Sequence, residues 1–99
     1  MRVIARKRLK DFWEIPEHRD AEQALKAWFY EAKHADWKTP SDIKAKYASA
    51  SILHNNRVVF NIAGNKYRLV VEIHYKSGII FIRFIGTHAE YDEMDAETI

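Results

Sequence analysis

Residues 57–86 read RVVFNIAGNKYRLVVEIHYKSGIIFIRFIG, a stretch in which apolar and polar side chains largely alternate. A period of two is typical of β-strands that are buried on one face. Gly64-Asn65 and Ser77-Gly78 interrupt the alternation, and both dipeptides favour tight turns between antiparallel strands. The stretch therefore predicts three antiparallel strands connected by two hairpins.

The strand register follows if each turn is treated as a two-residue loop. The first hairpin then places Asn61 opposite Arg68. The second hairpin places Glu72 opposite Arg83, and Arg68 opposite Thr87. Because successive side chains of a strand point to opposite faces, this register also divides the three strands into two faces.

The two predicted faces differ in their chemistry. The first is apolar or aromatic throughout and is expected to pack on helices; it contains Val58, Phe60, Ile62, Tyr67, Leu69, Val71, Ile73, Tyr75, Ile80, Ile82 and Phe84. The second mixes charged and polar side chains with apolar ones; it contains Arg57, Asn61, Arg68, Glu72, His74, Lys76 and Arg83, with Val59, Val70, Ile79, Phe81 and Ile85 between them.

Helical spacing precedes this sheet in the chain. The spacing of Leu9, Phe12 and Trp13 is that of one face of a short helix. A second helix is predicted over residues 16–35, because a proline suits its first turn and apolar residues recur every three or four positions. Thr39 is expected to cap a third helix, since a proline and then an acid follow it.

Two short elements complete the predicted fold. Residues 2–5 are partly β-branched and are expected to form an N-terminal strand. Thr87 and Glu90 have the spacing of a capping box, which predicts one helical turn after the last strand. The elements together predict an α+β fold, with helices packed on one face of a small antiparallel sheet.

The composition is that of one globular domain. The chain has 99 residues, of which 47% are hydrophobic, so we expect a single domain over residues 1–99 with one core. It has no cysteine, which excludes a disulfide scaffold and a thiolate metal site. No apolar run approaches the ~20 residues of a membrane span, and no apolar segment follows the N-terminal charges. We therefore expect a cytoplasmic protein that is not secreted.

The charges are unevenly distributed along the chain. Sixteen Lys and Arg residues stand against fourteen Asp and Glu residues, a net charge of +2. Five of the acids lie within residues 90–99, which contain no base, so the preceding residues carry sixteen bases and nine acids. A net positive charge on residues 1–89 is typical of proteins that bind nucleic acid. The surface of an ordinary soluble protein can carry a similar charge. The acidic tail is expected to fold over the basic surface or to contact a partner protein.

Five side chains form the candidate site, near the end of the sheet and the start of the last helix. They are Asn61, Arg68, Arg83, His88 and Tyr91. A guanidinium binds phosphate bidentately, and His and Tyr can carry protons. The five histidines do not fall into a metal-ligand pattern, so no metal or other cofactor is expected. The set therefore points to a phosphodiester site that works without metal.

Several of these residues, and other polar residues of the chain, also have a purely structural interpretation. Arg83 could form only a cross-strand ion pair with Glu72. Tyr91 could cap the core, and an exposed His74 need not be a base. The lysines of the third helix could simply form a solvated surface.

The sequence also resembles a known family. NIAGNKYRLV at residues 61–70 and IIFIRFIGTHAEYD at residues 79–92 resemble the HigB family of bacterial toxins. The family patterns FN-x-x-G-N-x-x-R and R-x-x-x-T-H-x-x-Y-D are both complete here. The resemblance implies a RelE-like fold and an mRNA interferase that acts on translating ribosomes. It also implies neutralisation by a HigA-type antitoxin with a helix-turn-helix domain.

The resemblance further implies roles for individual residues. Arg68 and Arg83 would hold the scissile phosphate while the RNA's own 2′-OH attacks it, which needs no metal. Asn61 would orient Arg68, and His88 and Tyr91 would transfer protons or stack on a base. The RNA backbone would be bound by lysines: Lys38, Lys44, Lys46, Lys66 and Lys76.

Two other functions stay open at this point. The first is a non-catalytic RNA- or ribosome-binding domain on the same fold. The second is a structural protein whose basic face binds an acidic partner.

Overall fold

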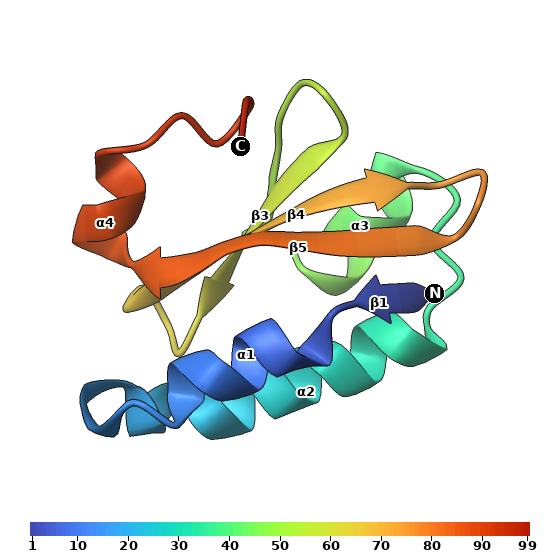
Figure 1. The fold of residues 1–99 in the computed structure, drawn as a ribbon. Coiled ribbons are helices and arrows are strands. Elements are labelled where there is room, and N and C mark those ends of the chain that lie inside the picture. Colours follow the sequence, from blue (N-terminus) through green and yellow to red (C-terminus); the bar gives the residue numbers. More distant parts are fainter.

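A five-stranded sheet organises the computed structural model, which describes all 99 residues (Figure 1). Its strands are β1 (Arg2–Ile4), β2 (Ser51–Ile52), β3 (Arg57–Ile62), β4 (Tyr67–His74) and β5 (Ile79–Thr87). They lie in the order β1-β5-β4-β3-β2.

The three-stranded meander and the N-terminal strand are confirmed. The sheet is mixed rather than antiparallel, however, because β1 pairs with β5 in parallel. Strand β2 was not predicted, since two exposed residues are too short to show a period.

The predicted helices are also present. They are α1 (Arg6–Trp13), the 3-10 helix η1 (Pro16–Ala21), α2 (Glu22–His34), α3 (Pro40–Lys46) and α4 (His88–Asp92). The segment predicted as one helix from Pro16 thus begins as a separate 3-10 turn before α2 continues. Helices α1 and α2 cover one face of the sheet, whereas α4 and the C-terminus lie on the other side (Figure 1).

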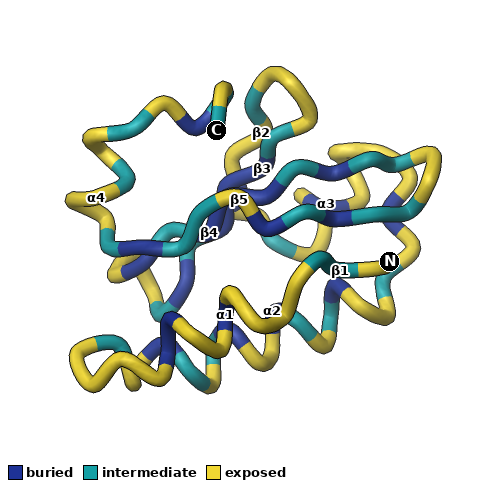
Figure 2. The backbone as a smooth tube through the Cα atoms, viewed as in Figure 1, coloured by how far each residue is buried: buried dark blue, intermediate teal, exposed yellow.

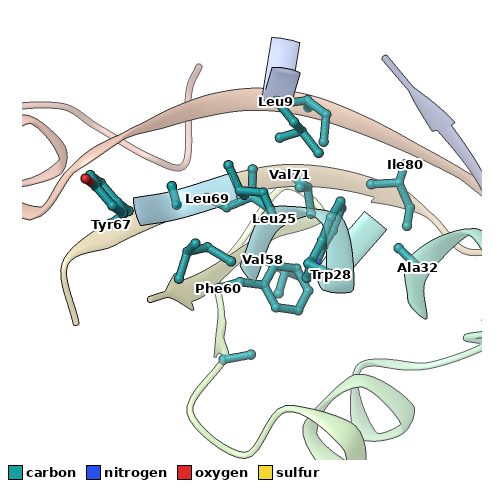
Figure 3. Packing of buried hydrophobic residues seen from close by; sticks show 14 of the residues in the cluster. Leu9, Leu25, Trp28, Ala32, Val58, Phe60, Tyr67, Leu69, Val71 and Ile80 are labelled. Carbon is teal, nitrogen blue, oxygen red and sulfur yellow. The ribbon is translucent and has the colours of Figure 1, made fainter. Parts of the chain in front are cut away.

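The main core lies between the sheet and helices α1, α2 and α3. Trp28 of α2 is 2% exposed and meets Phe60 of β3 edge to face, with ring centroids 5.4 Å apart. Leu9, Leu25 and Val71 are fully buried beside them (Figure 3). Burying a side chain of this size contributes roughly 1.5–3 kcal/mol. This layer therefore fixes the sheet against the helices, as the alternation of residues 57–86 predicted.

The register of the first hairpin is confirmed, and that of the second is wrong. Asn61 lies opposite Arg68, as predicted. In the second hairpin His74 pairs with Ile79, so the loop has four residues rather than two. Gly78 closes this loop with a positive φ of 71°, and its N–H donates to the carbonyl of His74 at 2.9 Å. The glycine is thus the last residue of a longer turn and not the second residue of a short one.

A β-bulge in β5 changes the faces of the residues that follow it. Val70 pairs with Phe84 and Val71 pairs with Ile82, which leaves Arg83 as an extra residue. A bulge of this kind reverses the inward and outward alternation beyond it. Phe84, predicted to face the helices, therefore packs on the opposite face with Val70.

The residues after the bulge are shifted in the same way. Ile85, predicted on the polar face, packs against the main core. Arg68 lies opposite Gly86 rather than Thr87, which instead faces Tyr67.

The face of the sheet away from α1, α2 and α3, here called the outer face, has a small apolar cluster of its own. Val59 and Val70 lie at its centre and are buried by Ala96 from the C-terminal segment. The side chains packed around them are Leu53, Phe84, Tyr91, Met94 and Ile99. Figure 2 shows the single buried position of that segment close to the C-terminus. The acidic tail thus folds back over the sheet, but its buried residue covers apolar side chains and not the basic surface that was expected.

No helix of the structure is both long enough and apolar enough to cross a membrane.

Candidate functional site

Three adjacent strands bring Asn61, Arg68 and Gly86 into one row at the end of the outer face. Asn61 pairs with Arg68 across β3 and β4, and Arg68 pairs with Gly86 across β4 and β5. One terminal nitrogen of Arg68, Nη1, donates to the carbonyls of Asn65 at 2.9 Å and Tyr67 at 3.2 Å. These bonds hold one edge of the guanidinium against the backbone at the β3–β4 turn. The remaining N–H groups of the guanidinium have no protein acceptor and are available to an anion.

Gly86 occupies a position that has no space for a side chain. A Cβ atom there would lie 2.5 Å from Cζ of Phe84 and 2.9 Å from Oε1 of Glu90. The Phe84 ring therefore lies against the backbone of Gly86. This close approach explains why the residue next to Arg68 in the row is a glycine.

The predicted capping box starts α4 beside this row. Oγ1 of Thr87 accepts from the Glu90 N–H at 3.2 Å, and Oε1 of Glu90 accepts from the Thr87 N–H at 2.8 Å. The bond from the Thr87 backbone is the main cause that lowers the pKa of Glu90, and the Thr87 hydroxyl and His18 lower it further. The His88 N–H donates to the carbonyl of Lys66 at 3.2 Å, which ties the start of the helix to the turn that precedes Arg68.

His88 and Tyr91 lie one turn apart on α4 but in different surroundings. His88 is exposed, and its Nδ1 is 3.2 Å from Oδ2 of Asp92. Tyr91 is half-buried and packs on the outer-face cluster that contains Val70 and Phe84. His88 is therefore accessible to a ligand, whereas the ring of Tyr91 holds α4 against the sheet.

Arg83 is not brought into the row. Its Nε and Nη2 donate to Oε1 of Glu72 at 2.9 and 2.6 Å. Glu72 also contacts Nη1 of Arg57 at 3.1 Å and Nε2 of His74 at 2.6 Å. The side chain of Glu72 is only 15% exposed. Burial by itself would raise its pKa, but the hydrogen bonds from Arg83 and His74 and the charges of Arg83 and Arg57 hold the pKa below its ordinary value. Arg83 thus makes the ion pair that the structural interpretation anticipated.

The five candidate lysines do not form one patch. Lys38 pairs with Asp36 at 3.0 Å, and Lys46 pairs with Glu31 at 3.4 Å. Lys44 donates to two backbone carbonyls that follow its own helix, those of Ala48 and Ala50. Lys76 has no ion-pair partner and lies in the β4–β5 turn, at the opposite end of β4 from Arg68. Only Lys66 is close to the row, because it precedes Arg68 by two residues.

Sequence reasoning missed a second layer behind Lys66. The carboxylate of Asp20, from η1, accepts hydrogen bonds from both Lys66 Nζ and the Tyr67 hydroxyl. Lys66 is the main cause that lowers the pKa of Asp20, and Tyr67 adds to it. His18 stacks on Phe12 with ring centroids 4.1 Å apart, and its Nδ1 is buried without a partner. These residues are far from Lys66 in the chain, so only the fold reveals that they support the β3–β4 turn.

No group of three or more His, Asp or Glu side chains gathers in a way that could hold a metal ion. The row and the neighbouring start of α4 together offer a guanidinium from Arg68, an amide from Asn61 and an imidazole from His88. This set can bind a phosphate and exchange a proton with it.

Comparisons with known proteins place the chain in a family. The model of HigB_toxin, described as the RelE-like toxic component of a toxin-antitoxin system, matches residues 21–94. The mRNA interferase toxin HigB of Escherichia coli (strain K12) is 33% identical over 100 residues, which cover 93% of this chain and 88% of that protein. The mRNA interferase HigB of Escherichia coli O6:H1 is 26% identical over 73 residues, 72% of this chain and 71% of that protein. The chain belongs to the HigB family of RelE-like toxins.

Proposed function

We propose that this toxin is an mRNA interferase: an endoribonuclease that cleaves mRNA on translating ribosomes and so inhibits translation in the cytoplasm. The observation that carries the proposal is the similarity, over nearly the whole chain, to proteins named mRNA interferase. The row of Asn61, Arg68 and Gly86 supports it, because Arg68 keeps free donors beside the exposed His88.

The proposed reaction uses the RNA's own 2′-OH as the nucleophile. Its oxygen attacks the adjacent phosphorus, the bond from phosphorus to the 5′-oxygen breaks, and a cyclic phosphate and a 5′-OH result. The 2′-OH loses one proton and the departing oxygen gains one. Arg68 binds the phosphate oxygens as negative charge develops on them, a contribution that fixed donors make in many active sites. His88 exchanges the proton, and Asn61 orients Arg68 from the neighbouring strand.

Arg83 and Tyr91 have supporting roles in this proposal. Arg83 reaches the phosphate only after it leaves Glu72, so its contribution depends on RNA competing for the guanidinium. Tyr91 keeps α4, and with it His88, in place through its packing on the outer-face cluster.

The lysines are proposed to contribute unequally. Lys66 contacts the RNA backbone next to the scissile phosphate once it exchanges Asp20 for RNA. Lys38, Lys44, Lys46 and Lys76 lie elsewhere on the surface and act mainly through long-range attraction to the ribosome.

The antitoxin of this toxin-antitoxin pair is proposed to be of the HigA type, with a helix-turn-helix domain. A neighbouring reading frame that encodes a small protein with that domain would support this assignment, and a partner gene of another class would contradict it.

Induced expression in bacteria tests the proposed activity. The wild-type chain should arrest growth and create new mRNA 5′ ends within coding regions, whereas Arg68→Ala should do neither. Arg2→Ala is the matched control, because Arg2 is exposed on β1 and pairs with Ile79 at the far end of β5. Growth arrest without new 5′ ends would instead indicate a non-catalytic ribosome-binding protein and contradict the proposal.

A further inference from the structure

The last seven residues, here called the C-terminal strap (residues 93–99), cross the outer face of the sheet. The strap follows α4, which begins beside Arg68, and it ends at Arg57, where Nη2 donates to the carbonyl oxygen of Ile99. Figure 1 shows this return from α4 toward the start of β3. Between the two ends, Ala96 covers Val59 and Val70. The strap therefore spans the outer face from the candidate site to a second arginine.

The groups that hold the strap are those that bind phosphate in other proteins. The backbone N–H of His54 donates to the carboxylate of Glu97 at 3.0 Å, and Nδ2 of Asn55 donates to the carbonyl of Glu97 at 3.0 Å. Arg57 adds a guanidinium. A backbone N–H, a side-chain amide and an arginine are common contacts to a nucleic-acid backbone. The strap is thus held by the same kinds of hydrogen-bond donor that bind an anionic backbone.

Arg57 keeps one N–H that no protein group accepts, and this atom is buried while the strap is in place. Its side chain is 11% exposed and already contacts Glu72 and the C-terminal residue, yet its Nε is buried without a partner. On β3, Arg57 and Asn61 are four residues apart and point to the same face, so they are separated by about 13 Å. A few nucleotides of a single strand span that distance.

The strap is held by three hydrogen bonds from residues 54–57 and by the packing of Met94, Ala96 and Ile99 on the outer face. Ala96 is its only buried residue, and Glu93 and Asp95 are exposed. Three acids, Glu93, Asp95 and Glu97, accompany it, so its departure would leave residues 1–92 with sixteen bases and eleven acids. A polyanion would therefore find a more basic surface once the strap has left.

We propose that the C-terminal strap occupies part of the RNA-binding surface and that RNA must displace it to run along the outer face from Arg68 to Arg57. This inference rests on the proposed function and adds that a segment of the toxin itself competes with RNA for the outer face. In the free toxin the strap excludes RNA from the outer face. RNA contacts the whole path from Arg68 to Arg57 only in molecules whose strap has left that face.

RNA binding to strap variants tests the proposal. The probe is a labelled single-stranded 2′-O-methyl RNA, which the toxin cannot cleave by 2′-OH attack, and its affinity is measured by fluorescence anisotropy. The strap variant is Glu93→Gln/Asp95→Asn/Glu97→Gln. Its control, Asp11→Asn/Glu14→Gln/Asp36→Asn, removes the same charge from exposed positions on or beside the helices of the other face.

The strap variant should bind this RNA about tenfold or more tightly than the wild type, the gain expected when an open state of about 10% or less becomes dominant. The control should gain much less. A chain that ends at Asp92 should also gain affinity, and Ala96→Asp, which detaches the strap while adding an acid, provides a second test if that truncation does not fold. Equal gains in the strap variant and the control would overturn the proposal.

Hydrogen exchange distinguishes displacement from a general charge effect. If RNA replaces the strap, adding the RNA should speed amide exchange in residues 93–99 of the wild type while it slows exchange in β3 and β4. Slower exchange in the strap would overturn the proposal even if the wild type still cleaves mRNA, and then the proposed function stands. Absence of RNA binding by every variant, together with absence of cleavage, would contradict both.

Discussion

Replacing Glu72 with glutamine should destabilise the toxin far more than loss of an ordinary surface charge. Glu72 accepts hydrogen bonds from Arg83 and His74 and forms an ion pair with Arg57, and its side chain is 15% exposed. Removing one partner of a buried ion pair costs about 3–5 kcal/mol. The side chains of Arg83 and His74 are 39% and 41% exposed, so solvent weakens their attraction to Glu72. The side chain of Arg57 is 11% exposed, so its attraction to Glu72 is weakened much less. We therefore expect Glu72→Gln to lower the free energy of unfolding by about 1.5–3 kcal/mol.

Urea denaturation measures this loss, with Glu22→Gln as the control. Glu22 pairs with Lys26 four residues along α2, and exposed pairs of this kind contribute about 0.3–0.5 kcal/mol. A loss of 2 kcal/mol in a domain of this size should lower Tm by roughly 8–16 °C. If the two substitutions cost the same, the cluster around Glu72 does not stabilise the outer face as described.

The pH dependence gives an independent check of the same cluster. Because the folded-state pKa of Glu72 lies below its ordinary value of 4.5, folding favours the ionised carboxylate. The stability that Glu72 adds is therefore fully present above pH 4.5 and is lost as the pH falls through the folded-state pKa. The gap between the wild type and Glu72→Gln should accordingly close in acid. A gap that stays constant down to that range would contradict the assigned ionisation.

Three further outcomes follow from the site. Gly86→Ala should lower the free energy of unfolding by about 1–3 kcal/mol, because its Cβ would lie 2.5 Å from the Phe84 ring; denaturation that matches the wild type would contradict the close approach. His88→Gln should slow cleavage by about 10²–10⁴-fold with little change in ribosome affinity, whereas Tyr91→Phe should retain activity because the ring still packs; single-turnover rates measured beside binding distinguish these roles. Cleavage should survive EDTA, since attack by the 2′-OH needs no metal; loss that a divalent cation restores on intact ribosomes would show otherwise.

The first hairpin and the core could be predicted because local and periodic signals agree there. Gly64 provides a positive φ in the turn, and the register that this turn sets also places Phe60 and Leu69 on the same buried face, as the alternation requires. The capping box at Thr87 is equally local, since its two bonds join residues three apart.

The second hairpin could not be predicted in the same way. Residues 79–82 are all apolar and do not alternate with polar ones. The sequence therefore does not show which of them face the helices, and a shifted register cannot be detected. The bulge that leaves Arg83 unpaired has no sequence signature of its own. The predicted register already placed Arg83 opposite Glu72, and in the structure Arg83 still forms that ion pair instead of joining Arg68.

The support behind the site depends on contacts that are distant in sequence. Asp20 binds Lys66 and Tyr67 across more than forty residues, and Glu97 binds His54 across a similar separation. The composition indicated only that the tail is acidic. Its position on the outer face results from the packing of Ala96 on Val59 and Val70.

Single-turnover cleavage of mRNA on programmed ribosomes tests the central claim most directly, with purified wild type, Arg68→Ala and Arg2→Ala compared at equal concentration. Arg68→Ala should cleave at least about 10²-fold more slowly, the loss typical when one fixed donor to the developing charge is removed, and its thermal unfolding should match the wild type. Arg2→Ala should cleave at the wild-type rate. A folded Arg68→Ala protein that cleaves as fast as the wild type would contradict the assignment of this row as the active site.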